Sequence, residues 1–222
     1  MDNRNFTFTN GKTLPVGTMY CIGRNYALHA KEMGAAVPAE PIVFLKPPAA
    51  YVPDGGEIEI PVFSKNVHHE LELVVVIGKD GENISKETAA EYIAGYAVGI
   101  DVTLRDVQAK AKEKGEPWAV AKGFKTSAPI SNVIPADRFK NGIPHFDIDL
   151  FVNDERRQSG TTTDMERSIS ELIEYLSSVF TLRAGDCIFT GTPEGVAQVQ
   201  PGDKIRAEIP WEVSLNISVS GL

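Results

Sequence analysis

Cysteine, long hydrophobic runs and basic clusters are scarce in this chain, and each shortage excludes a class of protein. Only Cys21 and Cys187 are present, both inside apolar runs, which favours buried reduced thiols over a disulfide framework. No apolar stretch approaches the ~20 residues that a membrane span needs. The polar start, residues 1–5, lacks the charged-then-apolar layout of a signal peptide. We therefore expect a cytoplasmic protein with no membrane partner.

The charge balance is acidic. The 22 basic and 30 acidic side chains give a net charge of −8, and no cluster of lysine and arginine of the kind that neutralises phosphates occurs. Nucleic acid is therefore not an expected partner. A chain of 222 residues, 42% of them hydrophobic, is long enough for one sizeable core and short for two. Because it also has no internal repeat, low-complexity segment or linker, we expect one domain over residues 1–222.

Short strands dominate the predicted secondary structure. Alternating or continuous apolar patterns bounded by Gly, Pro and Asp predict strands at 16–22, 42–45, 71–77, 95–100, 146–152, 187–190, 204–209 and 213–219. Helical periodicity predicts helices at 26–33, 86–93, 104–114 and 168–180. The expected fold class is α+β, mainly β.

Glu70 and Glu72 stand at the start of the most apolar of these strands. Residues two apart on a strand point to the same face, so the two carboxylates project side by side while Leu71 and Leu73 pack on the other face. Like charges at this spacing repel each other, and burial adds a desolvation cost of several kcal/mol for each unpaired ion. A bound metal ion is the simplest resolution. The alternative is an edge strand whose polar face is wet, with ordinary exposed glutamates.

Asp101 ends the apolar strand before the predicted helix 104–114. An Asp at this point is a common helix cap, and Thr103 with Asp106 resembles a capping box. Asp101 could instead complete an all-oxygen set with the two glutamates, which would suit Mg²⁺ or Mn²⁺. No Cys or paired His spacing supplies the ligands that zinc prefers. His68 shares the parity of the glutamates, and we expect it to neighbour the ligands rather than to bind the metal.

His29 and Glu32 are three residues apart in a predicted helix, and therefore lie on one face within hydrogen-bonding reach. Such a pair can act as a base that activates water, with the carboxylate holding the imidazole in one tautomer. The alternative is a solvated surface pair. Lys122 and the glycine-flanked segment 190–196 could each bind an anion, but the segment also reads as an ordinary turn.

Six segments, in their order and in their residues, resemble signature segments of the fumarylacetoacetate hydrolase superfamily. These segments are 22–26 (IGRNY), 44–47 (FLKP), 69–73 (HELEL), 101–108 (DVTLRDVQ), 121–122 (AK) and 190–196 (TGTPEGV). They extend over nearly the whole chain. The compact length resembles the single-domain branch that contains acylpyruvate hydrolases and oxaloacetate decarboxylases.

The resemblance implies a set of site residues. It implies Mg²⁺ or Mn²⁺ on Glu70, Glu72 and Asp101, a catalytic pair at His29 and Glu32, and substrate contacts at Arg24, Gln108, Lys122 and Thr192. Larger members have a further carboxylate ligand seven positions before the histidine, where this chain has Ile22, so three protein ligands completed by water are expected. The implied fold is a layered β architecture, a β-sandwich roll of mixed sheets with flanking helices, and the implied assembly is a homodimer.

The implied chemistry is cleavage of a C–C bond in a small 2-oxo acid. The carboxylate and 2-oxo oxygens of an acylpyruvate chelate a hard divalent ion, and cleavage leaves a pyruvate enolate. His29 would activate the attacking water, and Lys122 would stabilise the enolate. Oxaloacetate would lose CO₂ to give the same enolate without an attacking water. The alternatives are isomerisation or decarboxylation of muconate-type diacids and, from a different class, a metal-stabilised binding protein without turnover.

Overall fold

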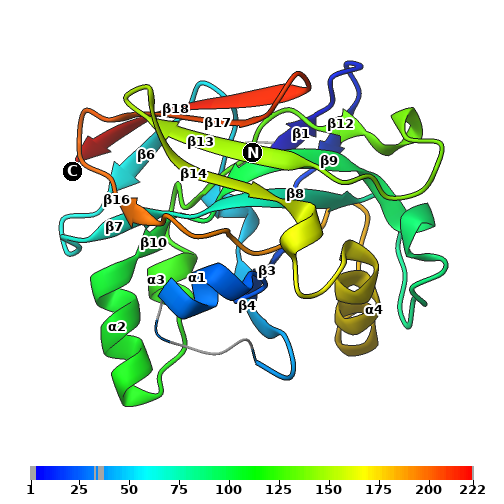
Figure 1. Cartoon of the computed structure of the whole chain (residues 1–222), viewed down its shortest axis with the longest axis horizontal. Helices are drawn as coiled ribbons and strands as arrows, with labels where there is room; N and C mark the ends of the chain where they lie inside the picture. Colours follow the sequence, from blue (N-terminus) through cyan, green and yellow to red (C-terminus); the bar gives the residue numbers. More distant parts are fainter. Residues whose placement is uncertain (1–3, 33, 35–37, 222) are drawn as a thin grey trace.

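The computed structural model describes residues 4–32, 34 and 38–221, which form several mixed β-sheets with a few helices (Figure 1). The central sheet has the strand order β12-β9-β8-β15-β3-β4. Its strands are β12 (Ile134–Pro135), β9 (Ile93–Ile100), β8 (Leu71–Ile77), β15 (Cys187–Phe189), β3 (Met19–Gly23) and β4 (Ile42–Lys46). All neighbours in this sheet are antiparallel except β15 and β3, which are parallel.

A second sheet of five strands has the order β14-β13-β17-β18-β6. Its strands are β14 (Glu155–Thr161), β13 (Asp147–Val152), β17 (Lys204–Ile209), β18 (Val213–Gly221) and β6 (Glu57–Ile60). Strands β13, β17 and β18 contact β8 and β9, so the two sheets form layers. In Figure 1 strands β17 and β18 of this sheet lie above β8 and β9, and the four α-helices lie below them.

The remaining elements are short. The small sheets are β10 (Thr103–Leu104), β7 (Val67–His69) and β16 (Ala197–Gln198); β1 (Asn5–Thr7) and β2 (Thr13–Pro15); and β11 (Ala128–Pro129) and β5 (Tyr51–Val52). The α-helices are α1 (Ala27–Glu32), α2 (Arg105–Lys114), α3 (Ala119–Lys122) and α4 (Ile169–Val179). The 3-10 turns are η1 (Pro48–Ala50), η2 (Ala89–Tyr92), η3 (Ala136–Arg138) and η4 (Thr162–Asp164). No helix among the described residues is long and apolar enough to cross a membrane.

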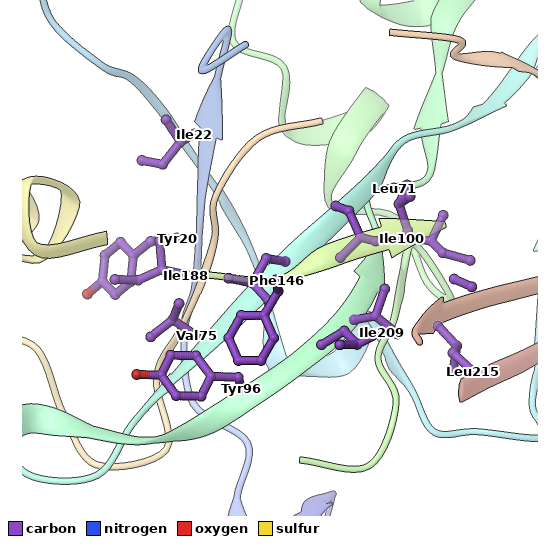
Figure 2. Close-up of a cluster of buried hydrophobic side chains, with 14 of the residues drawn as sticks. Tyr20, Ile22, Leu71, Val75, Tyr96, Ile100, Phe146, Ile188, Ile209 and Leu215 are labelled. Carbon is purple, nitrogen blue, oxygen red and sulfur yellow. The ribbon is translucent and has the colours of Figure 1, made fainter. Parts of the chain in front are cut away.

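Strand β8 is buried on both faces, and each face belongs to a different core. Leu71, Leu73 and Val75 belong to the larger core, which also contains residues of the five-stranded sheet. Figure 2 shows Leu71, Val75, Tyr96 and Ile100 of the central sheet together with Ile209 and Leu215 of the other. The opposite face of β8 carries Glu72 and then Val74 and Val76, which belong to a smaller core. Burial of each Leu or Val side chain stabilises the fold by about 1.5–3 kcal/mol.

All eight predicted strands are present, with ends shifted by a few residues, and three of the four predicted helices form. The predicted helix at 86–93 is wrong. Only the short turn η2 forms there, and Ile93 begins β9 by pairing with Ile77 of β8. Sheet pairing outweighed a weak helical pattern at this point. The sequence pattern also missed β14, whose residues ERRQSGT lack apolar alternation because the strand lies at a sheet edge.

Candidate metal and substrate site

The antiparallel register of β8 and β9 brings three carboxylates together. Glu72 lies opposite Gly99, and Leu71 lies opposite Ile100. The register therefore places Asp101 opposite Glu70, and the Asp101 backbone N–H donates to the Glu70 carbonyl at 2.8 Å. One oxygen from each of Glu70, Glu72 and Asp101 lies within 4.8 Å of the others, and all three residues are buried. The alternative of exposed glutamates on a wet face is thus excluded.

Asp101 and Thr103 do not cap helix α2. The N-cap residue is Leu104, and no side chain caps the helix there. Asp106 accepts hydrogen bonds from Ser64 Oγ at 2.7 Å and from the Lys65 backbone N–H at 3.0 Å instead of forming a capping box. The capping-box interpretation is therefore wrong, and the Asp101 side chain belongs to the carboxylate cluster.

Three basic side chains surround the cluster. Lys122 Nζ donates to Glu70 Oε2 at 2.8 Å, to Asp101 Oδ2 at 2.5 Å and to Thr103 Oγ1 at 2.6 Å. Arg105 Nη2 contacts Glu70 Oε1 at 2.6 Å. Lys46 Nζ, fully buried, lies 2.8 Å from Asp101 Oδ1. Buried charges in such contact offset much of one another's desolvation cost.

The pKa values of these groups move in opposite directions. Burial alone would raise the pKa of Glu70, but Lys122 and Arg105 outweigh burial and hold the pKa well below its usual range. Burial alone would lower the pKa of Lys122, but Asp101 and Glu70 raise it above its usual value, so the ammonium remains charged. Burial, then Asp101 and Glu70, raise the pKa of Glu72 well above its usual range. A divalent cation bound between these carboxylates would lower the pKa of Glu72 and so favour its ionised form.

The donor set fits a hard divalent cation. Glu70, Glu72 and Asp101 supply only carboxylate oxygens, which suit Mg²⁺ or Mn²⁺ rather than zinc. His68 does not belong to this group of possible ligands among the described residues. Its Nε2 lies 2.8 Å from Asn66 Oδ1 instead, and burial, with Arg105 and His69 nearby, lowers the pKa of His68 to about 4. His68 is therefore neutral.

His29 and Glu32 form a contact at the end of helix α1. His29 Nδ1 lies 3.2 Å from Glu32 Oε2, and the Gly195 backbone N–H donates to Glu32 Oε1 at 3.2 Å. His29 is only 6% exposed, whereas Glu32 is exposed, so the imidazole is buried and only the carboxylate of the pair faces solvent. With Nδ1–H directed to the carboxylate, Nε2 is the nitrogen that can accept a proton.

One cavity collects most of the predicted residues. Its lining includes the predicted Arg24, His29, Glu70, Glu72, Gln108, Lys122 and Thr192. Asp101 and Glu32 are not part of this lining, but each contacts a residue that is: Asp101 contacts Lys122, and Glu32 contacts His29. Ile22 also lines the cavity, at the place where larger relatives were expected to carry a further carboxylate. Phe44 and Trp118, with ring centroids 5.8 Å apart, give the cavity an apolar side.

The loop after β15 closes one side of the site because a glycine occupies a sharp turn. Gly191 has a φ of +101°, and a Cβ atom there would lie 2.8 Å from Asn25 Cβ. Its backbone N–H donates to Glu72 Oε2 at 2.6 Å. Asn25 holds the same loop, because its Nδ2 donates to the Thr190 carbonyl at 2.9 Å. The predicted anion-binding loop therefore contacts a carboxylate of the cluster directly.

Sequence reasoning assigned no role to three residues around this site: Lys46 and Gln158, which are buried, and Arg105, which is half-buried. Gln158 Oε1 accepts from the Leu71 N–H at 2.9 Å, and its Nε2 donates to Thr192 Oγ1 at 2.9 Å. It therefore joins β8 to the loop after β15. A lysine that ends the apolar strand 42–45 was an available signal for Lys46, and the i, i+3 spacing to Gln108 was one for Arg105. Gln158 lies in the polar strand β14 and left no signal.

Comparisons with known proteins agree with this arrangement. Residues 18–219 match the family model described as Fumarylacetoacetate (FAA) hydrolase C-terminal. The chain is 46% identical to the oxaloacetate tautomerase FAHD1, mitochondrial, of Bos taurus over 200 residues, which cover 90% of each protein. It is 48% identical to the oxaloacetate tautomerase YcgM of Escherichia coli (strain K12) over 191 residues, which cover 86% of this chain and 87% of that protein.

A solved structure is also similar. The fumarylpyruvate hydrolase from Pseudomonas aeruginosa, in complex with Mn²⁺ and pyruvate, superposes with a TM-score of 0.94 and 41% sequence identity. The superposition covers 100% of this chain and 97% of that chain. The fold class predicted from the sequence, mainly β with mixed sheets and few helices, is confirmed by this neighbour.

Proposed function

The chain belongs to the fumarylacetoacetate hydrolase family, and from that premise we propose that it is a divalent-metal-dependent enzyme acting on a small 2-oxo acid. Oxaloacetate and the acylpyruvates are the proposed substrates, and the enolate of the pyruvate part is the shared intermediate. Two relatives named as oxaloacetate tautomerases and a neighbour that holds Mn²⁺ and pyruvate support this choice. We propose Mg²⁺ or Mn²⁺ as the cofactor.

The observation that carries the proposal is the gathering of three kinds of group on one cavity. The cavity is lined by carboxylates that suit a metal, by the charged Lys122 and by His29, whose Nδ1 is held by Glu32. A metal that only stabilised the fold would need the carboxylates alone. The lysine and the histidine add a cation for a developing negative charge and a proton acceptor, which are the groups that enolate chemistry requires.

The proposed roles follow from these contacts. A divalent ion held by Glu70, Glu72 and Asp101 would supply Lewis acidity for the carboxylate and 2-oxo group of the substrate. Lys122, which stays protonated, would stabilise negative charge on the enolate oxygen without giving up its proton. Arg24, Gln108 and Thr192 line the same cavity and would orient the substrate.

His29 would move the proton in tautomerisation and in hydrolysis. With oxaloacetate, Nε2 would accept the C3 proton and return it to the 2-oxo oxygen, which converts the keto form into the enol form. With an acylpyruvate, Nε2 would deprotonate a water that attacks the distal carbonyl, and the C–C bond electrons would pass to the pyruvate part as its enolate. Loss of CO₂ from oxaloacetate would leave the same enolate and needs no water. One site could thus serve tautomerisation, decarboxylation and hydrolysis.

The test uses protein stripped of metal and then supplied with Mg²⁺ or Mn²⁺. Ultraviolet absorbance of the enol would be followed with oxaloacetate and with acetylpyruvate, alongside a control that contains the metal alone. We expect turnover above that control with at least one substrate, lost with EDTA and restored by the metal. Glu72→Gln should lower kcat/KM by roughly 10²-fold or more, because it removes one of three charged ligands.

The matched control is Glu82→Gln, which changes an exposed glutamate and should leave kcat/KM unchanged. If the protein binds Mn²⁺ but shows no turnover with any 2-oxo acid tested, it is a metal-stabilised binding protein and the proposed activity is wrong. Turnover only with a muconate-type diacid would instead support the isomerase alternative.

A further inference from the structure

Glu70 and Asp101 each have both carboxylate oxygens in contact with basic side chains, and a different side chain reaches each of the two oxygens. Arg105 Nη2 lies 2.6 Å from Glu70 Oε1, and Lys46 Nζ lies 2.8 Å from Asp101 Oδ1. Lys122 Nζ, in contrast, contacts the other oxygen of each, Glu70 Oε2 and Asp101 Oδ2. Because one nitrogen reaches both of these oxygens, they face a common point. Each carboxylate therefore presents a single oxygen toward the site.

The third carboxylate, Glu72, also has one oxygen in contact with the protein, but its partner is a backbone N–H rather than a basic side chain. Glu72 Oε2 accepts the Gly191 N–H at 2.6 Å. The loop that carries this N–H is itself held to β8, because Thr190 N–H and Thr190 Oγ1 both bond to the Leu73 carbonyl, at 3.1 Å and 3.0 Å. Each carboxylate thus has one oxygen in close contact with a protein group other than Lys122, through an ion pair at Glu70 and at Asp101 and through a hydrogen bond at Glu72.

The two basic donors are fixed in place. Lys46 Nζ is fully buried and also donates to the Ser127 carbonyl at 2.9 Å and to the Val102 carbonyl at 3.3 Å. Arg105 is the first residue of α2, and its Nη1 donates to Gln108 Oε1 at 2.9 Å. Rotating either carboxylate to offer both of its oxygens would break one of these charged contacts inside the protein, which is costly.

Mg²⁺ and Ca²⁺ differ in how they use carboxylates. Mg²⁺ takes about six ligands at about 2.0–2.1 Å in an octahedron, keeps several waters and needs only one oxygen from each carboxylate. Ca²⁺ takes about six to eight oxygens at about 2.3–2.6 Å and commonly gains the extra ligands from bidentate carboxylates. A site that offers one oxygen per carboxylate therefore suits the smaller ion.

We propose that Arg105 and Lys46 make the site selective for Mg²⁺ over Ca²⁺ by restricting Glu70 and Asp101 to one metal-facing oxygen each. This inference rests on the proposed metal dependence and goes beyond it, because it names the residues that choose the ion. Neither residue needs to touch the metal or the substrate. Both are positioning residues that act through a carboxylate.

The test measures binding rather than turnover. Electron paramagnetic resonance reports free Mn²⁺, and displacement of bound Mn²⁺ by Mg²⁺ or by Ca²⁺ gives the dissociation constant of each ion. The informative quantity is the ratio of the Ca²⁺ constant to the Mg²⁺ constant. Loss of a nearby positive charge strengthens the binding of both divalent ions by a similar factor, so this effect cancels in the ratio.

Arg105→Met and Lys46→Met are the test variants, and Lys112→Met is the matched control. Lys112 lines the same cavity, with Nζ 5.1 Å from the Trp118 ring centroid, and no described contact joins it to the three carboxylates. We expect the wild-type protein to bind Mg²⁺ more tightly than Ca²⁺. Arg105→Met and Lys46→Met should each lower the ratio roughly tenfold, because a freed carboxylate can become bidentate to Ca²⁺. Lys112→Met should leave the ratio unchanged.

The inference is overturned if Ca²⁺ binds the wild-type protein as tightly as Mg²⁺, or if the test variants keep the wild-type ratio. Circular dichroism checks that each variant is folded. If Lys46→Met does not fold, Arg105→Met, whose altered side chain is partly exposed, decides the question alone. If the protein turns over a 2-oxo acid but does not prefer Mg²⁺ to Ca²⁺, this inference is refuted and the proposed function stands. If it prefers Mg²⁺ but turns over no 2-oxo acid, the proposed function is refuted and this inference stands.

Discussion

At the level of single residues, the proposed role of His29 as a base depends on two successive contacts, from His29 to Glu32 and from Glu32 to Gly195. Its Nδ1 faces Glu32, and Glu32 is held by the Gly195 backbone N–H. A carboxylate that fixes Nδ1–H leaves Nε2 as a proton acceptor and stabilises the imidazolium that forms. The same contacts join helix α1 to the loop after β15, so a change at Glu32 would alter both the base and the loop. Substitution of His29 itself is the cleaner test.

His29→Ala should separate hydrolysis from decarboxylation. Acylpyruvate hydrolysis should fall by on the order of 10²- to 10⁴-fold, the usual contribution of a positioned general base. Decarboxylation of oxaloacetate should fall less, because it needs no activated water, whereas Lys122→Ala should lower both rates comparably. The measurement is kcat/KM for both substrates in both variants. Equal losses in His29→Ala would refute a role specific to water activation.

Tyr51 provides a pH prediction away from the site. Tyr51 in β5 is 9% exposed, and its ring meets Phe6 edge-on at a centroid distance of 5.6 Å. Burial, with a smaller contribution from Cys187, raises the pKa of Tyr51 to about 12 from an ordinary value of 10.0. The folded state therefore holds this proton more tightly than the unfolded state. The resulting stability is present below pH 10 and is lost as the pH rises through 12.

Tyr51→Phe should therefore flatten the alkaline part of the stability curve. Ionisation of the Tyr51 hydroxyl lowers the free energy of unfolding by at most about 3 kcal/mol between pH 9 and pH 12. Urea unfolding of the wild-type protein and the variant at several pH values measures this, and the two should have equal slopes with pH below pH 9. A variant that loses stability above pH 10 as steeply as the wild type would contradict the assignment.

At the level of elements, helix α4 shows how a local signal supports a distant site. Ser168 caps the helix and forms a capping box with Glu171. The preceding residue, Arg167, donates its backbone N–H to Asn25 Oδ1 at 2.9 Å, and Asn25 holds the Thr190 carbonyl. The start of α4 is thus tied to the loop that contacts Glu72. The helix packs an apolar face on the larger core.

Ser168→Ala should destabilise the protein by about 1 kcal/mol, the usual cost of losing a helix cap. The metal-binding residues do not change, so the KM for the substrate should stay close to the wild-type value. Urea unfolding gives the stability, and Ser178→Ala on the exposed end of the same helix is the control, expected to stay within about 0.5 kcal/mol. A Ser168→Ala variant as stable as this control would show that the cap contributes nothing.

At the level of the whole molecule, this acidic chain keeps three of its 30 carboxylates buried in one cluster. A divalent ion that binds the folded state and not the unfolded state should raise the stability by about 2.7 kcal/mol at a hundredfold excess over its dissociation constant. For a chain of this length the melting temperature should rise by roughly 5–10 °C. Thermal unfolding with EDTA and with saturating Mg²⁺ measures the shift.

Glu72→Gln is the control for this measurement, and its melting temperature should respond much less to Mg²⁺. An equal shift in both proteins would place the stabilising ion elsewhere. The homodimer that the family resemblance implies stays a prediction as well. Sedimentation velocity of the metal-loaded protein would check it, and a monomer at micromolar concentration would contradict it.

The local features of this protein could be predicted from its sequence. Strand periodicity identified β8 and its neighbours, because the alternation of faces along a strand is a property of a few consecutive residues. The same parity placed Glu70 and Glu72 together, and the i, i+3 spacing placed His29 beside Glu32. These pairs depend on geometry within one element. The helix expected at 86–93 failed because a partner strand, which no local pattern reveals, took Ile93.

The residues that surround these pairs could be identified only from the folded structure. The residues around Asp101 allowed either a helix cap or a metal ligand, and the family resemblance implied the ligand; the β8–β9 register then showed that Asp101 faces Glu70 rather than capping α2. Lys46 and Gln158 reached the site from strands distant in sequence, as buried polar groups paired by contacts that span many residues. A short sequence pattern encodes where a side chain points on its own element. It does not encode which distant oxygen will satisfy a buried charge, because that depends on how the sheets pack.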